Sequence, residues 1–417
     1  MSSPLAMLTD TSSAALFSLD PSRVCYLNAA SRTPLPISTL DIGLKAVRRK
    51  AETPWDIGDT EADKDKVRAL FASLLGSSAT AQDIAMVPCC SYAMSLAANN
   101  FRTKMRSRAP DHRVVIVLQD QNPSNVMQWQ QLCEEEGGQV KVIPYQPDGN
   151  WSRAVCAALA MGNVAVAALP PCHWCDGSLV ELPPIASACR AHGTSLVLDA
   201  TQWVGAGPTI DVGALGVTFL ACSIHKWLLG PYGGALCYAS PEFWSRAQPL
   251  EQHDRNREGA QHVECLPMSG AHGGYPMAFQ EGARRLDGGG RPSFIVLPML
   301  LESLRVLTER IGVERLQERL AAYTEELVRR SQLLGFSAPP RHAPGIVGLK
   351  PGPGLPDADA IVRFLKARKP RPVLVSERFG VIRVSPHTYN TIEDLECLIS
   401  GLHDAIVAAP RAVTSRL

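Results

Sequence analysis

The sequence predicts an α/β protein with two domains: a large domain whose mostly parallel sheet of about seven strands lies between helices, and a smaller C-terminal α/β domain. Between residues 84 and 240, short apolar runs alternate with stretches that have helical signals. The runs are continuously apolar, which is typical of strands that helices cover on both faces. The 417 residues suffice for two domains. We expect an N-terminal segment at 1–20, the large domain at 21–285 and the small domain at 286–417.

The expected strands of the large domain are short runs dominated by Val, Ile, Leu and Ala. They span residues 84–87, 114–118, 140–143, 164–169, 196–198, 217–222 and 235–238. Only Gly230-Pro231-Tyr232-Gly233-Gly234 separates the last two runs. Because this stretch is too short for a helical crossover, we expect that pair to be antiparallel.

Helices are expected between most of these strands and again in the C-terminal part. Ser124 is expected to N-cap a helix that runs to about Glu136 and stops at Gly137-Gly138. Another helix opens at Pro183-Pro184 and ends near His192-Gly193. The C-terminal pattern predicts a long helical stretch at 297–334 broken near Gly312, a strand at 345–349, a helix at 358–366, strands at 373–375 and 381–384, and a final helix from Ile392.

Composition and charge are those of an ordinary soluble globular protein. Hydrophobic residues make up 46% and charged residues 19% of the chain, and the net charge of +1 gives no electrostatic basis for binding nucleic acid or an anionic membrane. No apolar run approaches the roughly 20 residues that cross a bilayer. Residues 1–17 lack the basic start of a secretory signal. We therefore expect a cytoplasmic protein.

Twelve cysteines are scattered through core-like runs, which favours free thiols in a reducing compartment over a disulfide framework. Cys172 and Cys175 form a lone Cys-x-x-Cys pair. One such pair cannot supply the four ligands of a zinc site, so no metal is expected. Two half-buried residues in a turn are the simpler interpretation of the pair, and a redox role is the alternative.

Lys226 and Asp199 each end an apolar run that reads as a buried strand. Taken alone, a lysine in this place can snorkel from a strand end. Taken together, the two residues fit pyridoxal phosphate (PLP), since a lysine can form a Schiff base with the aldehyde and a carboxylate can keep the pyridine nitrogen protonated. Because both residues end parallel strands, we expect them at the same edge of the sheet.

Further polar groups at this edge fit the rest of the cofactor. Gln202 can reach the phenolic oxygen, and Ser223 and His225 flank the lysine and can hold the phosphate. Ser91 and Tyr92 open a helix after the first strand, and its N–H groups make a second phosphate anchor. Singly, Ser91 reads as an N-cap and Gln202 as a turn residue. Their joint placement favours the cofactor.

These motifs resemble the class V aminotransferase family of fold-type I PLP enzymes, which includes cysteine desulfurases and isopenicillin-N-epimerase-like proteins. The segments that match are Tyr26-Leu27-Asn28-Ala29-Ala30, Pro123-Ser124-Asn125 with Trp129, Asp199-Ala200-Thr201-Gln202, Ser223-Ile224-His225-Lys226 and Arg383-Val384-Ser385-Pro386-His387. The resemblance implies an amino-acid substrate whose α-carboxylate binds Arg383, with Asn28 also in the substrate site. It further implies a homodimer with the active site at the interface, in which Gly290 reaches the partner's phosphate through its backbone.

The chain departs from the cysteine desulfurases of that family. No cysteine lies between Arg341 and Glu396, where the resemblance places their nucleophile. Asn122 stands where they stack a histidine on the ring as a cofactor contact, and Trp174 stands in the substrate site where they have a small polar residue. The sequence therefore predicts aminotransferase or β-elimination (C–S lyase-like) chemistry through a Lys226 Schiff base.

Three other functions compete with this one. An amino-acid epimerase of the same family keeps the whole site and differs only in the fate of the substrate. A catalytically inactive scaffold with the PLP fold is disfavoured because Lys226, Asp199 and Arg383 are all present. A nucleotide-binding oxidoreductase is disfavoured because no G-x-G-x-x-G follows the first strand.

Overall fold

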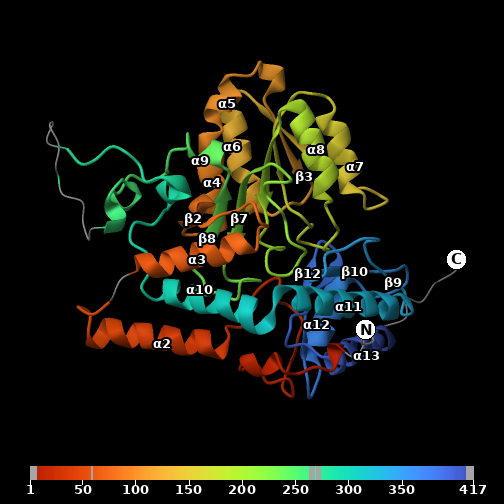
Figure 1. The fold of residues 1–417 in the computed structure, drawn as a ribbon. Coiled ribbons are helices and arrows are strands. Elements are labelled where there is room, and N and C mark those ends of the chain that lie inside the picture. Colours follow the sequence, from red (N-terminus) through yellow and green to blue (C-terminus); the bar gives the residue numbers. More distant parts are fainter. Residues whose placement is uncertain (1–6, 58–59, 263–267, 269–273, 410–417) are drawn as a thin grey trace.

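A seven-stranded sheet forms the middle of the larger α/β unit in the computed structural model (Figure 1). The structure describes residues 7–57, 60–262, 268 and 274–409. The strands of this sheet are β2 (Ile84–Val87), β3 (Val114–Leu118), β4 (Gln139–Ile143), β5 (Val164–Leu169), β6 (Ser195–Asp199), β7 (Val217–Ser223) and β8 (Ala235–Ala239). Their order in the sheet is β2-β8-β7-β6-β5-β3-β4. All the strands predicted for the large domain are confirmed.

Strand β8 is the one strand of this sheet that runs against the others. Strands β4, β3, β5, β6 and β7 are parallel, whereas β8 is antiparallel to both β7 and β2. The antiparallel pair predicted from the short Gly-rich connection is therefore confirmed. Every residue of β3 and β5 is buried, which explains why these strands read as continuous apolar runs.

Helices cover both faces of the sheet. One face packs against α4 (Cys90–Asn100), α5 (Arg102–Arg106), α6 (Met127–Glu136) and α9 (Pro241–Trp244), with Met94, Trp129 and Phe243 in their common apolar core. The other face packs against α3 (Glu61–Ser73), α7 (Trp151–Leu159), α8 (Leu182–His192) and α10 (Val296–Arg305), with Phe71, Val155 and Leu300 in theirs. None of the helices in the described part of the chain is both long and apolar enough to span a lipid bilayer.

The helix ends follow the sequence with one exception. Gly137 and Gly193 end α6 and α8 in the left-handed conformation, with φ of +61° and +62°, as predicted. Ser124 is not the N-cap of α6. It lies inside a short 3-10 turn (Pro123–Asn125), and Asn122 caps this turn by accepting a hydrogen bond at Oδ1 from the backbone N of Ser124 (3.1 Å). An asparagine ahead of a proline supplies the better start.

A long helical stretch joins the larger unit to the smaller one, as predicted. After α10, a π-helical turn (Val306–Ile311) leads to Gly312, whose φ of +79° breaks the helix before α11 (Val313–Gln332). The remaining elements are β9 (Phe336–Ser337), β10 (Val347–Pro351), α12 (Ala358–Ala367), β11 (Val373–Leu374), β12 (Ser376–Arg378), β13 (Val381–Val384) and α13 (Ile392–Ala408). Four of them form a sheet in the order β12-β13-β10-β9. The two shortest of these, β9 and β12, were not predicted.

The start of the chain packs with its end. Strand β1 (Cys25–Tyr26) pairs in parallel with β11, and Leu8 and Leu27 lie in the apolar core of the smaller unit together with Leu349 and Leu395. Helix α2 (Ile37–Glu52) then lies beside α10 (Figure 1). The domain boundaries at residues 20 and 285 stay a prediction, and the first six residues of the expected N-terminal segment lie outside the described residues.

Candidate active site

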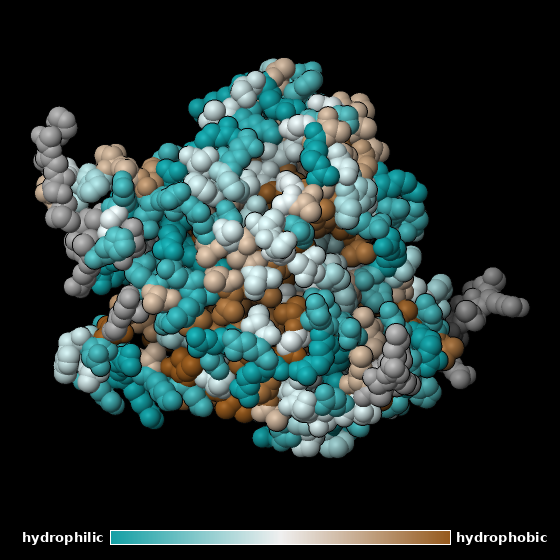
Figure 2. All heavy atoms as spheres, in the orientation of Figure 1, coloured by the Kyte–Doolittle hydropathy of each residue, from teal (hydrophilic) through white to brown (hydrophobic). Residues whose placement is uncertain are grey.

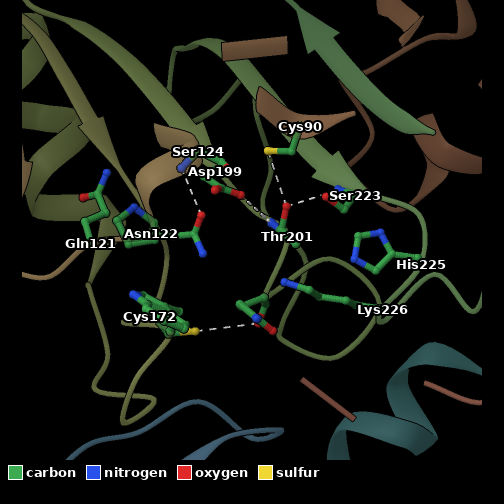
Figure 3. A pocket seen from close by; sticks show the side chains of 13 residues that line it. Cys90, Gln121, Asn122, Ser124, Cys172, Asp199, Thr201, Ser223, His225 and Lys226 are labelled. Atoms are coloured by element: carbon green, nitrogen blue, oxygen red, sulfur yellow. Dashed lines mark hydrogen bonds between the residues drawn. The ribbon is translucent and has the colours of Figure 1, made fainter. Parts of the chain in front are cut away.

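A pocket lies where the carboxyl ends of β2, β3, β5, β6 and β7 converge (Figure 3). Each of these strands, which all point the same way, contributes the loop that follows it, and the cavity measures about 210 Å³. Open α/β sheets bind their ligands at this edge. The lining residues are Cys90, Gln121, Asn122, Ser124, Pro170, Cys172, Trp174, Asp199, Thr201, Gln202, Ser223, His225 and Lys226.

Lys226 reaches into the pocket from the loop after β7 (Figure 3). Its backbone is held by a tight turn, in which the backbone N of Leu229 donates to the carbonyl of Lys226 (3.0 Å). Burial lowers the pKa of the Lys226 amine, and the charge of Asp199 acts in the opposite direction. Its Nζ makes no hydrogen bond or ion pair with any residue in the described ranges. A desolvated amine without a partner is suited to act as a nucleophile.

Asp199 is the last residue of β6, and its side chain is held in place by a small network. Its Oδ1 accepts a hydrogen bond from the backbone N of Thr201 (3.1 Å). The Thr201 hydroxyl in turn accepts from the backbone N of Ser223 (3.1 Å) and donates to the Cys90 sulfur (3.6 Å). These bonds tie the ends of β2, β6 and β7 together, so the carboxylate is fixed beside the pocket with only 8% of its residue surface exposed.

Gln202 and Asn122 line the pocket with amide groups that are already oriented. Gln202 Nε2 donates to the carbonyl of Ala30 (3.0 Å), and its Oε1 accepts from Trp227 Nε1 (2.9 Å). One N–H of this amide is left for a ligand. The Oδ1 of Asn122 is engaged by the Ser124 backbone, so its amide nitrogen points the other way (Figure 3). Two amide donors therefore face a common space.

His225 stacks on Tyr232, with ring centroids 4.4 Å apart and an interplanar angle of 21°. Burial, followed by the charge of Lys226, lowers the pKa of His225 to about 4. Its imidazole is therefore neutral near pH 7 and offers one N–H donor. Together with the hydroxyl of Ser223, it gives the pocket a pair of neutral donors next to the lysine.

Trp174 lines the pocket from the loop after β5, and this loop is firmly held. Its Nε1 donates to the carbonyl of Asp120 (2.7 Å), and its own carbonyl accepts from Arg383 Nη1 (2.9 Å). The flanking Cys172 and Cys175 are buried free thiols, and burial raises the pKa of Cys175 to about 12. Thiols that stay protonated are poor nucleophiles, which favours the packing interpretation of the Cys-x-x-Cys pair.

Arg383 reaches Trp174 from β13 of the smaller unit and is 1% exposed. Its Nη2 donates to the hydroxyl of Ser31 (2.7 Å), while its Nε is buried without an acceptor. No carboxylate of the described residues lies within ion-pair distance of it. Burial, and then the charge of Arg378, lowers the pKa of Arg383 to about 10, so it stays protonated at neutral pH. A buried guanidinium without an acid is suited to take an anion from outside the chain.

Several predicted site residues lie outside the lining of this pocket. Ser91 and Tyr92 stand in the first turn of α4, and Ser91 lines a neighbouring groove instead. Gly290 lines a separate pocket, together with its neighbours Gly288 and Gly289 and with Gly233 and Gly234. Asn28 accepts a hydrogen bond at Oδ1 from the hydroxyl of Ser376 (3.1 Å). Arg383 also lies outside the lining, which it contacts through the carbonyl of Trp174. The structure thus brings together the residues at the strand ends, and the roles of these five residues stay predictions.

The structure also adds residues that the sequence analysis did not single out. Thr201 lies between Asp199 and Gln202, so its position inside this motif could have indicated that it belongs to the site. Ser31 and Arg378 had none, because each reaches the site through contacts with residues far away in the sequence.

The residues at the pocket fit PLP. The site holds a desolvated amine without a partner at Lys226, a fixed carboxylate at Asp199 and neutral donors at Ser223 and His225. These are the groups that an aldehyde, a pyridine nitrogen and a phosphate require. A carboxylate of Asp199 with one oxygen engaged keeps the other available for a ring N–H. We therefore assign these residues to the cofactor as a proposal that the chemistry of the donor set supports.

Comparisons with known proteins point in the same direction. The family model described as aminotransferase class-V matches residues 55–351. The chain is 28% identical over 235 residues to a cysteine desulfurase from Salmonella typhimurium (strain LT2) and to one from Salmonella typhi. These alignments cover 55% of this chain and 56% of each relative, so the chain spans about half the length of the curated relatives it matches.

Solved structures are similar over nearly the whole chain. The apo cysteine desulfurase from Thermococcus onnurineus NA1 has a TM-score of 0.75 and 19% sequence identity, covering 93% of this chain and 95% of that one. The cystine C-S lyase C-DES in complex with cysteine persulfide has a TM-score of 0.77 and 19% identity, covering 91% of this chain and 97% of that one. At this identity the two likenesses show that the fold is shared.

Proposed function

Because this chain belongs to the aminotransferase class-V family of PLP-dependent enzymes, we propose that it converts an α-amino acid at the pocket that holds Lys226 and Asp199. The observation that supports this most is the meeting of these two residues at the carboxyl ends of β7 and β6, with the amine free and the carboxylate fixed. Arg383 supports an amino-acid substrate, since it is a buried guanidinium with no acid of the described chain to pair with.

The proposed roles follow from the state of each side chain. When bound, PLP supplies an electron sink that makes the α-hydrogen of an amino acid acidic. Lys226 Nζ, whose pKa burial lowers, takes that proton from the substrate Cα and returns it. Asp199 holds the proton on the pyridine nitrogen, and Arg383 orients the substrate through a two-point contact with its α-carboxylate.

Transfer of the amino group is the reaction that the pocket supports best. Of the other titratable side chains in the lining, His225 has its pKa lowered to about 4, and burial raises the pKa values of the Cys90 and Cys172 thiols. With Asp199 assigned to the pyridine nitrogen, Lys226 is the lining residue that remains to move a proton at the substrate. Amino transfer needs one base that moves a proton between two carbon atoms, whereas β-elimination additionally needs a side-chain group that leaves as a stable anion.

A persulfide route of the desulfurase kind has no support in this chain. Residues 342–395 contain no cysteine, and the cysteines nearest the pocket are buried thiols with raised pKa values. Elimination without such a nucleophile, epimerisation and a scaffold without activity are the alternatives that experiment must separate.

We also propose that the protein is a homodimer. Helix α2 exposes an apolar stripe at helical spacing, made of Ile37, Leu40, Leu44 and Val47, which are 38%, 42%, 51% and 49% exposed. Figure 2 shows apolar residues gathered over this part of the molecule. A second copy would cover such a stripe. Light scattering should report a dimer mass for the wild type and a monomer mass for Leu44→Glu; an unchanged mass would contradict the proposed interface.

The reaction can be identified by the stoichiometry of its products. PLP-loaded protein should be mixed with a panel of amino acids and S-substituted cysteines, and 2-oxo acids, ammonia, sulfide and D-enantiomers measured. Amino transfer should give one equivalent of 2-oxo acid per bound cofactor without ammonia. Repeated release of pyruvate with ammonia would indicate elimination instead, and racemised substrate would indicate epimerisation. A protein that binds no PLP, or turns over every substrate equally well as Lys226→Ala, would refute the proposed function.

A further inference from the structure

We infer that Arg378 is a specificity residue that binds a second anionic group of the substrate, so that the preferred amino acids have a side chain ending in a carboxylate. This inference rests on the proposed function, in which Arg383 takes the α-carboxylate. It is carried by the way one hairpin presents two guanidinium groups to one wall of the pocket.

The register of the β12–β13 hairpin places the two arginines on one face. Arg383 lies directly opposite Ser376 in this antiparallel pair. Arg378 is two residues further along the same strand as Ser376, so its side chain leaves the sheet on the same side. The two guanidinium groups are thus diagonal neighbours of the kind that interact across strands.

Both arginines meet the same tryptophan. The guanidinium carbon of Arg378 lies 5.6 Å from the ring centroid of Trp174, and that of Arg383 lies 5.8 Å from it. Trp174 lines the pocket. Neither arginine is itself a lining residue, but both cations lie against the ring of one, so they place positive charge next to this wall of the pocket.

Neither cation is neutralised by the chain itself. Arg378 donates from Nη1 to the carbonyl of Glu377 (2.6 Å), and its Nε is buried without an acceptor. The Glu377 carboxylate is turned to the other side, where it accepts from the backbone N of Gly380 (2.7 Å). In the described ranges no acid comes within ion-pair distance of either arginine, and the charge of Arg378 helps to lower the pKa of Arg383.

The acids nearest to this wall are engaged or exposed. Asp176 accepts from the backbone N and the hydroxyl of Ser178 (2.9 and 2.7 Å). Asp120 is an exposed residue, and it is its carbonyl, not its carboxylate, that accepts from Trp174. Two unpaired guanidinium groups side by side repel one another unless an anion separates them, and a dicarboxylate satisfies both at once.

The wall that holds these charges is rigid enough to select a ligand. Gly348 in β10 donates from its backbone N to the carbonyl of Asp176 (2.8 Å), and a Cβ at Gly348 would lie 2.7 Å from the Asp176 Cα. The loop that contains Trp174 is thereby docked on the small sheet. At the tip of the hairpin, Phe379 meets Trp174 edge to face, with centroids 6.3 Å apart. Preorganised contacts of this kind are what a specificity pocket needs.

Binding of simple carboxylates tests the inference without relying on turnover. The PLP-loaded wild type should be titrated calorimetrically with succinate, glutarate and butyrate. Since a hydrogen-bonded contact to a charged group contributes tenfold to a hundredfold in affinity, roughly, the better dicarboxylate should bind at least about tenfold more tightly than butyrate. Arg378→Met should abolish this preference and leave the affinity for butyrate within about twofold.

Two controls separate the inference from a structural effect and from the proposed function. Arg363→Met removes an exposed arginine that pairs with Asp359 on α12, and it should keep the wild-type preference. Arg378→Lys retains the charge and should keep part of it. Equal affinity of the wild type for mono- and dicarboxylates, no binding of any of the three acids, or a preference that survives Arg378→Met would overturn the inference. Failure of the proposed function would show separately, as absent PLP binding or absent amino-acid turnover.

Discussion

Replacing Arg383 by methionine should separate its effect on substrate binding from its effect on the fold. The guanidinium is buried, has no acid partner in the described part of the chain, and holds only the Trp174 carbonyl and the Ser31 hydroxyl. If it binds the substrate α-carboxylate through two charge-assisted hydrogen bonds of about 1.5–3 kcal/mol each, its loss should cost about 3–6 kcal/mol of binding. This corresponds to a roughly hundredfold to ten-thousandfold weaker affinity.

The same substitution should change stability little. Replacing buried ionic groups by apolar residues of similar volume is often neutral or stabilising by about 1–4 kcal/mol, and Arg383→Met leaves no charged partner behind. Against this, the Trp174 carbonyl and the Ser31 hydroxyl each lose a partner, at a cost of about 1–3 kcal/mol for a buried group and less here, because both bonds are only part-buried. The free energy of unfolding of Arg383→Met should therefore stay within about 2 kcal/mol of the wild type.

Two measurements on the same preparations decide the matter. The affinity for a panel of amino acids is read from the change in cofactor absorbance, and stability is read from the midpoint of urea unfolding. The reasoning is refuted if affinity is unchanged, or if the variant loses more than about 4 kcal/mol of stability, since Arg383 would then be a structural residue. Arg363→Met serves as the matched control and should change neither quantity, because its ion pair is exposed.

Three further predictions concern single groups. After borohydride reduction of PLP-loaded protein, mass spectrometry of a digest should find the cofactor on the Lys226 peptide and none in Lys226→Ala; attachment elsewhere would contradict the assignment. Burial lowers the pKa of His387 to about 3, so the unfolded chain takes up a proton that the folded chain refuses, and stability should fall as the pH drops from 6.5 towards 3, by roughly 4 kcal/mol. The stability of His387→Phe should fall less steeply with decreasing pH than that of the wild type. Identical pH dependence of the two proteins would show that His387 is not the cause. Contact with the Cys25 side chain, and then the charge of Arg371, lowers the pKa of Cys397, whereas burial raises the pKa of Cys175 to about 12. Iodoacetamide at pH 7 should therefore label Cys397 long before Cys175; equal rates would disprove this order.

The sheet could be predicted because its strands are buried on both faces. Every residue of Val164–Leu169 is buried, and such a strand must be apolar throughout. The site followed from the same property, since a charged residue that ends an apolar strand, such as Asp199, or that follows one closely, such as Lys226, has to lie at the carboxyl edge. Gln202 and Ser223 were predicted at this edge from their positions just after or at the end of a strand, and both line the pocket.

What escaped prediction depends on pairing between distant segments. Strand β1 is two residues long and pairs with β11 near the other end of the chain, so no local sequence pattern predicts this strand. Arg378 looks like a solvated charge in the sequence, and only the register of a three-residue strand brings it beside Arg383. Ser124 was misplaced as an N-cap because Asn122 and Pro123 offer a better local start.

The residues proposed to hold the cofactor and those proposed to select the substrate come from different parts of the fold. The end of β6 supplies Asp199 and the loop after β7 supplies Lys226, whereas the β12–β13 hairpin supplies Arg378 and Arg383. Trp174 joins the two, because it lines the pocket while its carbonyl accepts from Arg383. Changes in the hairpin should therefore alter which amino acid is bound without disturbing the groups that hold the cofactor. In a family whose members share one fold, selection through such a hairpin lets substrate preference change while the proton chemistry at Lys226 stays the same.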